Sequence, residues 1–524
     1  MKNRLFNLVI VAFIFPIYLH AQENYYGGEN GKKLDWTIHY LQDYYVDSLN
    51  VDSLAEIAII NMLASLDPFS VYQSAETLAK QKENDSGYSG MGIGLDYFLL
   101  KDQAIVTWIL KDSPADSAQI VRGDLLLSVN EVDVHKASKE EIKALFQSEE
   151  EDIVKIEISR KGQKMMKEIK IDRLPLYSIL SSYMITGEVG YIKQYNYTQK
   201  SVKEMEDAIA DLKELGMKKL VLDLRGNYGG VVTSAVEIAD IFLSKGKLVC
   251  YTDGYNQDRE DFETKEKGLF EKGEMIVLVD AYTKSAAELF TVALQDWDRA
   301  LIMGVPTFGK GLVQQSYQLN DSSAVRLTIA KYFSPTGRTL QKYIDYDATW
   351  LNTQQEKLSK NYITSDLLAP SEVQVKTHSG RTVLGGEGGV IPDIYMAHLD
   401  EEKHLSEHPD LYTFSTTYLA QNRDALKLRY PAVEEYTKDE KLEQDLSVGL
   451  FSFLGSGYEL PNIESSTMST SIGDLAMVRM KSWIAAQLWD DASYYQVINT
   501  NDKVIKEAVT LFDNGTMLRL KIQN

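Results

Sequence analysis

Between residues 188 and 396 the sequence alternates between short apolar runs, which are typical of buried strands, and amphipathic stretches, which are typical of helices. The strand patterns lie at 189–192, 219–224, 275–279, 300–303 and over 312–333, and the helical patterns at 202–214, 231–243 and 285–297. A chain that alternates in this way folds into a sheet covered by helices. We therefore expect a layered α/β domain in this part of the chain.

The segments on either side follow other patterns. Residues 33–85 carry apolar residues at helical spacing, and residues 400–524 are again mostly helical and in places highly charged. From 88 to about 173, a glycine-rich turn leads into short strands with one helix among them. With 524 residues in all, the chain is long enough for about two to four domains.

The N-terminus has the pattern of a secretory signal peptide. Lys2 and Arg4 precede an apolar run from Leu5 to Leu19, and Ala21 provides an acceptable cleavage site. The run is short for a membrane span, although an uncleaved anchor stays open as the alternative. We expect cleavage after Ala21 and an exported protein that is periplasmic or associated with the cell envelope.

Charge and cysteine content exclude several functions. The formal net charge is −21, with no basic run, so the phosphate backbone of a nucleic acid would be repelled. Cys250 is the single cysteine and cannot form an internal disulfide. Because it stands in an apolar run, we expect a small buried side chain rather than a nucleophile.

The sequence contains no suitable motif for metal-dependent or histidine-dependent catalysis. His404 and His408 would share a helix face, but Pro409 follows them, so a solvated helix end is the better interpretation. No Gly-x-Ser-x-Gly motif is present, and the Ser-x-x-Lys pattern at Ser244 and Lys247 lacks the companion motifs of penicillin-binding proteins. We expect no metal ion and no cofactor.

A partial phosphate-binding motif runs from Gly304 to Lys310. Gly311 occupies the position where a serine or threonine should bind magnesium, and the strand-like run 312–319 stands where a helix should follow. Nucleotide binding is therefore not favoured.

Ser285 is expected at the start of a helix, after the buried strand that ends at Asp280. The positive end of the helix dipole would stabilise a developing alkoxide there. The first-turn amide of Ala286 lacks an acceptor within the helix and is free to face an oxyanion. A serine nucleophile needs a base, and a neutral lysine can serve where no histidine is suitable.

Lys310 is the preferred base. Bringing a lysine pKa from about 10.4 to near neutrality takes a shift of about three units, or about 4 kcal/mol, which burial in an apolar pocket can supply. Phe308, Gly309 and Gly311 flank Lys310 and keep carboxylates away. Lys284 is the rival base, but it is adjacent to the serine in sequence, and neighbouring side chains diverge.

A second glycine-rich turn runs from Gly226 to Gly230, after the buried strand 220–225. Paired glycines let the backbone turn its amides toward a ligand, so Gly229 and Gly230 could complete an oxyanion hole. A plain strand-to-helix turn is the alternative, and composition alone favours it slightly.

Together and in order, these motifs resemble the carboxyl-terminal processing peptidases, also called tail-specific proteases. Each motif is weak alone, but their order and spacing are specific. The resemblance covers about residues 35 to 396. The motifs that carry it are Leu66-Asp67-Pro68-Phe69-Ser70-Val71-Tyr72, Gly90-Met-Gly-Ile-Gly94, Ser113-Pro-Ala115, Arg122-Gly-Asp124, Asp223-Leu-Arg225-x-Asn227-x-Gly229-Gly230, the Ser285 segment, Thr307-Phe-Gly-Lys310-Gly311 with Gln314, Pro335-x-Gly337-Arg338 and Gly389-Val-Ile-Pro392-Asp393.

The resemblance implies a Ser285/Lys310 dyad assisted by Gln314. It also places the oxyanion amides at Ala286 and at the Gly229–Gly230 turn. It further implies a PDZ domain that binds peptide C-termini by strand addition. The peptide-binding loop of that domain would comprise Gly90, Met91, Gly92, Ile93 and Gly94.

The implied fold class is multidomain α/β, with a layered core of the ClpP/crotonase type and an inserted β-rich domain. The expected segments are a signal peptide at 1–21, a helical N-terminal region at 22–86, the PDZ domain at 87–173, the α/β peptidase domain at 174–399 and a helical C-terminal extension at 400–524. Two departures from the usual family motifs are Lys284, which adds a charge beside the nucleophile, and Tyr228, which replaces a proline.

The function we expect is that of an exported serine endopeptidase that cleaves proteins near their C-termini through an acyl-enzyme. Its partners would be proteins or peptides with accessible C-termini and no nucleic acid, and an adaptor protein is compatible with this assignment. The alternative is a catalytically inactive, PDZ-containing scaffold that binds peptides.

Overall fold

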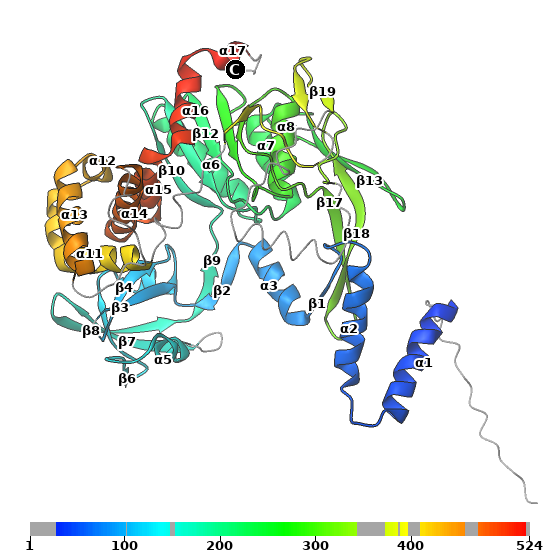
Figure 1. The fold of residues 1–524 in the computed structure, drawn as a ribbon, viewed down its shortest axis with the longest axis horizontal. Coiled ribbons are helices and arrows are strands. Elements are labelled where there is room, and N and C mark those ends of the chain that lie inside the picture. Colours follow the sequence, from blue (N-terminus) through cyan, green and yellow to red (C-terminus); the bar gives the residue numbers. More distant parts are fainter. Residues whose placement is uncertain are drawn as a thin grey trace, which may run out of the picture. The chain divides into compact units, whose positions relative to one another are not determined.

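The computed structural model describes residues 28–100, 102–146, 152–342, 373–385, 388–396, 409–455 and 470–519 (Figure 1). The predicted signal peptide, His404 and His408 lie outside the described residues. Contacts divide the chain into two units, Met1–Leu66 and Asp67–Asn524.

The first unit contains the two helices α1 (Gly28–Tyr44) and α2 (Val51–Ala64), in agreement with the helical pattern of the sequence. Asn50 caps α2, because its side chain accepts a hydrogen bond of 3.1 Å from the amide of Ser53. None of the described helices is both long and apolar enough to cross a membrane.

A six-stranded sheet forms the centre of the second unit. Its neighbours in order are β10 (Ile179–Met184), β11 (Val189–Gln194), β12 (Lys219–Asp223), β15 (Met275–Val279), β16 (Leu301–Gly304) and β21 (Ile394–Tyr395). Only the β10–β11 pair is antiparallel. A parallel sheet is normally covered on both faces, which explains why every residue of β15 is apolar and buried.

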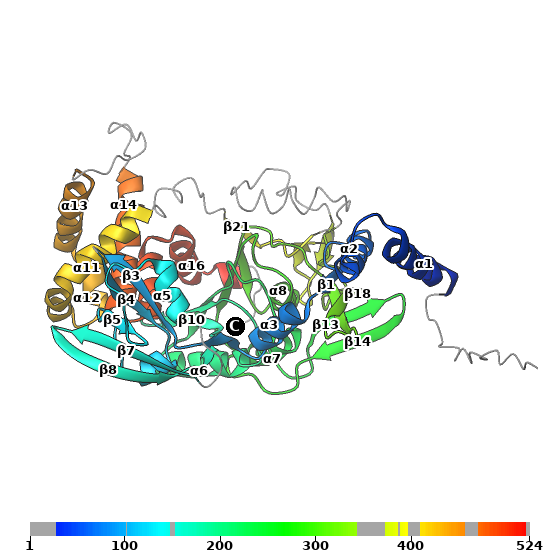
Figure 2. The ribbon, with the colours of Figure 1, turned by 90° about the horizontal axis from the view of Figure 1, so that it is seen from below.

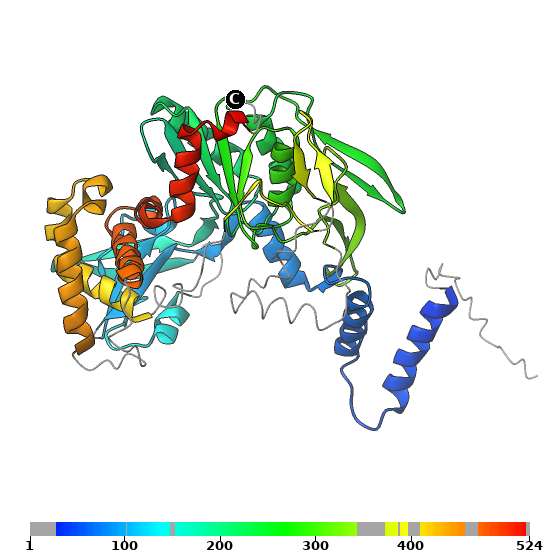
Figure 3. The same ribbon diagram turned by 45° about the horizontal axis from the view of Figure 1, so that its top comes forward.

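Helices cover both faces of this sheet, as the alternating pattern predicts. On one face lie α6 (Ser201–Glu214), α7 (Val232–Phe242) and α8 (Ala286–Asp296), which share a buried cluster with Leu222 and Val277. On the other face lies α16 (Lys503–Asp513), drawn in red in Figure 3, which packs against Val221 and Ile276. The end of the C-terminal extension thus supplies a layer of the core, a role that the sequence pattern does not indicate.

A second sheet joins β1 (Val71–Gln73), β18 (Ala324–Phe333), β13 (Leu248–Gly254) and β14 (Gln257–Glu263), and β17 (Leu312–Gln318) also pairs with β18. Figure 2 shows β13 and β14 as a hairpin. Since β1 precedes the PDZ-like segment and β18 follows it, that segment is inserted into the larger domain. The strand β17 also begins two residues after Lys310, where a phosphate-binding loop would need a helix.

The inserted domain has a sheet and a core of its own. Its sheet runs in the order β3 (Leu95–Leu100), β4 (Gln103–Ile109), β5 (Leu125–Val129), β7 (Ile153–Arg160) and β8 (Gln163–Lys170), with β6 (Val132–Asp133) on β5. The helices α4 (Pro114–Ser117) and α5 (Lys139–Leu145) complete it. Ile142 of α5 and Val106 of β4 lie in one buried cluster, and β3 occupies an edge of the sheet.

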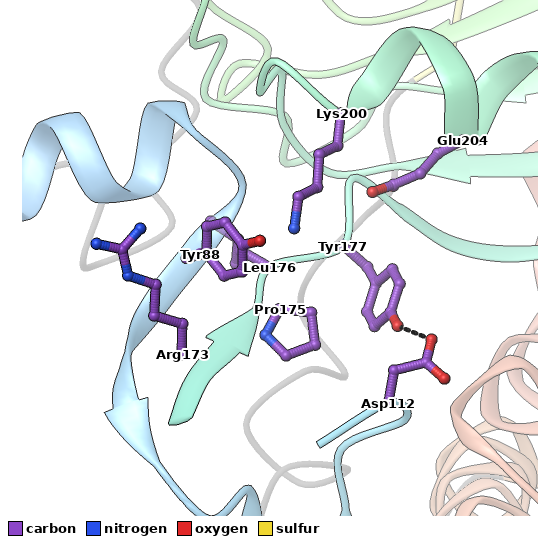
Figure 4. A pocket seen from close by; sticks show the side chains of 8 residues that line it. All are labelled: Tyr88, Asp112, Arg173, Pro175, Leu176, Tyr177, Lys200 and Glu204. Atoms are coloured by element: carbon purple, nitrogen blue, oxygen red, sulfur yellow. Dashed lines mark hydrogen bonds between the residues drawn. The ribbon is translucent and has the colours of Figure 1, made fainter. Parts of the chain in front are cut away.

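The chain enters and leaves this domain through one antiparallel pair, β2 (Tyr88–Gly92) and β9 (Asp172–Pro175), in which Tyr88 faces Pro175. Figure 4 shows a pocket at this junction. In it the amine of Lys200 lies 3.5 Å from the centre of the Tyr88 ring, and the Tyr177 hydroxyl donates a hydrogen bond of 2.5 Å to Asp112. The first contact joins the N-cap residue of α6 to β2, and the second joins the segment after β9 to the loop after β4.

The other described elements are helices and one short hairpin. The helix α3 (Ala75–Asp85) follows β1, and β19 (Gln374–Lys376) pairs with β20 (Thr382–Leu384). The C-terminal extension contains α11 (Pro409–Arg429), α12 (Val433–Thr437), α13 (Glu440–Gly455), α14 (Thr470–Leu488), α15 (Asp491–Ile498), the short η3 (Asn499–Asn501), α16 and α17 (Thr516–Arg519). The helices α11 to α15 share one hydrophobic cluster around Tyr436 and Leu446.

Candidate active site

Ser285 lies at a sharp turn between β15 and α8. Its φ of 58° and ψ of −122° are unusual for a residue with a side chain, and such conformations concentrate at functional sites. The turn is held by the carboxylate of Asp280, which accepts hydrogen bonds from the amides of Tyr282 at 3.0 Å and Thr283 at 2.9 Å. Every residue of α8 is buried, so the helix that follows Ser285 is firmly anchored.

The fully buried carboxylate of Glu288 brings Ser285 and Lys310 together. Its Oε2 accepts hydrogen bonds from the backbone amides of Ser285 at 2.8 Å and of Lys310 at 2.9 Å. Its Oε1 accepts hydrogen bonds from the Thr307 hydroxyl at 2.5 Å and the Gly309 amide at 2.6 Å. Burial raises the pKa of Glu288 to about 7, while these four donors favour its ionised form.

Glu288 was not among the predicted site residues. The pattern that could have revealed it is Ser285-x-x-Glu288 at the start of a helix, where a glutamate side chain commonly accepts a hydrogen bond from the backbone amide three residues earlier. Glu288 also holds the loop from Thr307 to Lys310, which begins nearly twenty residues later, and no local sequence pattern predicts a contact between segments so far apart.

The side chain of Lys310 has the environment that a neutral lysine requires. Burial first, and then the positive charges of Arg326 and Lys284, lower the pKa of Lys310 to about 8. Its Nζ donates a hydrogen bond of 2.9 Å to Oε1 of Gln314. Among the described contacts there is no hydrogen bond from this Nζ to the Ser285 hydroxyl, and such catalytic hydrogen bonds are often long in substrate-free structures.

Phe69 completes the surroundings of Lys310. Nε2 of Gln314 donates a hydrogen bond of 2.5 Å to the Phe69 carbonyl, and Nζ of Lys310 lies 4.9 Å from the centre of the Phe69 ring. The segment before β1 therefore orients the side chain that bonds to the lysine. The sequence marked Phe69 only as part of a motif and gave it no role.

The predicted oxyanion turn lies against the turn of Ser285. A Cβ atom added to Gly229 would lie 2.7 Å from the carbonyl oxygen of Lys284 and 2.9 Å from Cβ of Ser285. The amide of Gly229 donates a hydrogen bond of 2.9 Å to the Asn227 side chain. Within the described part of the chain the amide of Gly230 has no such acceptor, and Gly230 is exposed. The Gly230 amide is therefore open to a ligand.

Lys284, the rival base, faces aromatic rings. Its ammonium lies 4.8 Å from the centre of the Tyr228 ring and 5.6 Å from that of Phe308. Burial also lowers the pKa of Lys284. Its backbone amide donates a hydrogen bond of 3.0 Å to the carbonyl of Asn227, which ties the serine turn to the glycine turn.

The described residues offer no alternative cysteine nucleophile and no metal site. Cys250 is fully buried, which confirms the predicted burial of its side chain, and burial raises the pKa of its thiol to about 12. The described residues contain no group of three or more histidine, cysteine, aspartate or glutamate side chains placed to hold a metal ion.

The predicted peptide-binding loop of the inserted domain leads into its edge strand. Gly90 and Met91 lie in β2, and Gly92 ends that strand. The carbonyls of Ile93 and Gly94 accept hydrogen bonds from Ala115 at 2.8 Å and Leu110 at 2.9 Å, which fixes the loop against the body of the domain.

Comparison with known proteins identifies both domains. The family model of peptidase family S41 matches residues 188–350, which include Ser285 and Lys310, and the PDZ domain model matches residues 105–160. A probable CtpA-like serine protease of Staphylococcus aureus (strain MRSA252) is 32% identical over 348 residues, which cover 65% of this chain and 69% of the relative. The chain belongs to peptidase family S41.

A second relative gives the same result. A probable CtpA-like serine protease of Staphylococcus epidermidis (strain ATCC 12228 / FDA PCI 1200) is 32% identical to this S41 peptidase over 336 residues, which cover 63% of the chain and 67% of the relative. Among solved structures, a photosystem II D1 C-terminal processing protease matches 71% of the chain and 88% of its own length, with 22% identity and a TM-score of 0.37.

The expected family and fold class are therefore confirmed. The protein is a CtpA-like S41 serine protease with an α/β peptidase domain, a PDZ domain, and helices at both ends of the chain. Its substrates are peptides or proteins.

Proposed function

We propose that this S41 peptidase is an exported endopeptidase in which Ser285 is the nucleophile and Lys310 the general base. The observation that carries the proposal is the shared acceptor: one oxygen of Glu288 accepts hydrogen bonds from the amides of both residues. The lowered pKa of Lys310, about 8, supports the role of a base because a substantial fraction of the amine is neutral at mildly alkaline pH.

The reaction proceeds in two halves. The free amine of Lys310 accepts the proton of the Ser285 hydroxyl while the oxygen attacks the substrate carbonyl carbon. The amides of Gly230 and Ala286 donate hydrogen bonds to the resulting oxyanion, and Gly229 gives the turn its shape. The lysine ammonium then passes its proton to the leaving amine, and the peptide bond breaks.

Water completes the cycle. Lys310, neutral again, accepts a proton from a water molecule that attacks the acyl-enzyme, and the proton returns to the serine oxygen as the ester bond breaks. Gln314, which is bonded to Nζ of Lys310 and to the Phe69 carbonyl, orients the amine in both halves. No metal ion or cofactor takes part in this scheme.

The PDZ domain would select substrates by their free C-termini. Its edge strand β3 can accept an added peptide strand, and the loop Gly90–Gly94 that leads into it is suited to receive a terminal carboxylate. Cleavage near the C-terminus follows from this mode of capture. The expected signal peptide, with cleavage after Ala21, supports export to the periplasm or cell envelope.

The decisive test compares Ser285→Ala and Lys310→Ala with the wild type on an unstructured protein substrate. Both variants should lose cleavage, while Lys284→Met should retain it because that ammonium faces aromatic rings. Wild-type cleavage by either of the first two variants would refute the proposed mechanism, whereas an absence of cleavage by the wild type itself would favour the catalytically inactive scaffold. Substrates that differ only in a free or amidated C-terminus test the role of the PDZ domain.

Export has a separate test. N-terminal sequencing of the protein recovered from fractionated cells should begin at Gln22. Recovery of the intact N-terminus in the membrane fraction would instead show an uncleaved anchor.

A further inference from the structure

The segment from Asp491 to Asp502, which comprises α15 and the residues before α16, contacts both domains of the second unit. Asp502, the residue before α16, pairs with Arg225, which directly precedes the glycine turn; its Oδ2 lies 2.8 Å from the guanidinium. Asp491, at the start of α15, bonds to the PDZ domain. Both aspartates lie outside residues 188–350, the part that the peptidase model matches.

Asp502 completes a cluster of four charges. Arg225 bonds to both oxygens of Asp223 at 3.0 and 2.7 Å. Nζ of Lys193 lies 3.3 Å from Asp223 and also donates a hydrogen bond to the carbonyl of Arg225. The side chains of these residues are only 2 to 18% exposed, and two negative charges balance two positive ones. Without the charge of Asp502, the cluster would carry an unpaired positive charge in a poorly solvated place.

The position of Arg225 is coupled to the turn that follows it. The amide of Gly226 donates hydrogen bonds of 3.0 Å to the Asp280 carboxylate, which also holds the turn of Ser285. The carbonyl of Asn227 accepts a hydrogen bond from the amide of Lys284. A shift of Arg225 would therefore move the adjacent glycine turn and, through these hydrogen bonds, the turn of Ser285.

The same aspartate fixes the helix that carries it. Oδ1 of Asp502 accepts hydrogen bonds from the amides of Val504 at 2.8 Å and Ile505 at 3.1 Å, so one side chain caps α16 and pairs with Arg225. Since α16 packs on the central sheet through Val504 and Ile505 among others, its N-terminus is a rigid support for the guanidinium.

The other end of the segment is anchored on the PDZ domain. Asp491 accepts hydrogen bonds from the indole of Trp108 at 2.7 Å and from Arg122 at 2.9 Å. Between the two aspartates, the Asn499 side chain donates a hydrogen bond of 3.0 Å to the Tyr183 hydroxyl, on the edge strand β10. A short stretch of chain thus connects a PDZ strand, the central sheet and the glycine turn.

We propose that Asp502 is a positioning residue for the oxyanion turn, acting through Arg225, and that the segment from Asp491 to Asp502 makes this positioning depend on the contact with the PDZ domain. The inference rests on the proposed function, because it assigns the turn to transition-state stabilisation. It gives the C-terminal extension a part in the active site.

Two substitutions separate the effect of the Asp502 charge from the effect of Asp502 as the N-cap of α16. Asp502→Asn keeps the cap, since asparagine caps helices as well as aspartate does, but it loses the charge that pairs with Arg225. Asp502→Glu keeps the charge and is a poor cap. For a positioning role, kcat on a quenched peptide with an amidated C-terminus should fall about tenfold in Asp502→Asn, and less in Asp502→Glu.

Substrate affinity distinguishes positioning from general damage. In a Ser285→Ala background, Asp502→Asn should leave the Kd of the uncleaved peptide within about twofold, because the turn acts on the transition state. Asp513→Asn is the matched control: it removes the same charge at the other end of α16, where Asp513 meets Lys219 at 3.3 Å and its side chain is 72% exposed. That control should keep wild-type kcat.

The link to the PDZ domain is tested by a double-mutant cycle. Asp491→Asn should lower kcat about threefold in the wild type and have little further effect in Asp502→Asn, because both changes disturb the same series of contacts from the PDZ domain to the glycine turn. Equal effects of Asp491→Asn in both backgrounds, or none in either, would overturn the link.

The outcomes also separate this inference from the proposed mechanism. A wild-type kcat in Asp502→Asn, or a kcat lower in Asp502→Glu than in Asp502→Asn, would overturn the positioning role even if Ser285→Ala is inactive. Retained activity in Ser285→Ala would instead refute the mechanism itself.

Discussion

The backbone amide of Lys310 donates a hydrogen bond of 2.9 Å to Oε2 of Glu288. The same oxygen accepts a hydrogen bond from the amide of Ser285. A single buried carboxylate therefore sets the distance between the Ser285 and Lys310 segments, on which the proposed mechanism depends. Each oxygen of Glu288 has two donors and therefore needs to be an acceptor.

Glu288→Gln should lower kcat about 100-fold, because its amide nitrogen would face two donors and displace either the serine or the lysine segment. The free energy of unfolding should fall by about 1–3 kcal/mol for each donor left unsatisfied. Peptide cleavage and thermal unfolding measure the two effects. Glu237→Gln, at an exposed position on α7, is the control, and wild-type kcat in Glu288→Gln would contradict the role assigned to the carboxylate.

The pH dependence should follow the amine of Lys310. Because its pKa is lowered to about 8, kcat/KM should level off above that value and fall below it, by more than tenfold for each pH unit below about pH 7, where Glu288 also takes up a proton. Arg326→Gln removes a positive charge that opposes protonation of Lys310, so the acidic limb should move to higher pH by about half a unit. Arg259→Gln, whose guanidinium pairs with Asp261 at the surface, should leave the profile unchanged. A limb that moves to lower pH in Arg326→Gln would exclude Lys310 as the titrating base.

Gln314→Ala should lower kcat about tenfold with a smaller change in KM, because the amine of Lys310 loses the acceptor that orients it. The adjacent Gln315, exposed on the same strand, provides the matched control Gln315→Ala. Steady-state kinetics on one quenched peptide measure both variants. Equal kcat values for the two would show that Gln314 does not orient the base.

Gly230→Ala should inactivate the enzyme by about 100-fold and destabilise it by about 1–3 kcal/mol, since the new Cβ would lie 2.1 Å from the carbonyl oxygen of Tyr197. Gly246→Ala, with a φ of 77° and no atom within 4 Å of the new Cβ, places an alanine at another positive φ without a clash. It should cost about 1 kcal/mol of stability and no activity. Kinetics and chemical denaturation separate the two, and an active Gly230→Ala would argue against an oxyanion role for this turn.

The elements around the site were largely predictable because their patterns are local. The strand β15, the start of α8 and the strand character after Lys310 all follow from apolar periodicity and from glycine positions. The resemblance to a known family then supplied the order of the domains, and the comparisons confirm the family and the fold class.

The rest depends on contacts between residues far apart in sequence. Phe69 meets Gln314 across 245 positions, and Trp108 meets Asp491 across 383. No periodicity encodes such pairs, because each partner alone is an ordinary residue of a strand, helix or loop. For the same reason the sequence indicated helices at the C-terminus but did not show that α16 forms a layer of the peptidase core.

The pairing of Tyr88 with Pro175 bears on how such a protein can change over evolution. Because the chain leaves and re-enters the peptidase domain at neighbouring positions, the PDZ module could be exchanged for another, or lost, with one short turn closing the gap. The junction would tolerate such a replacement more readily than the C-terminal helices, whose contacts to Trp108 and Arg122 match this particular module. A lineage that swaps the module must therefore change its C-terminal segment as well, and the two parts are expected to be inherited together.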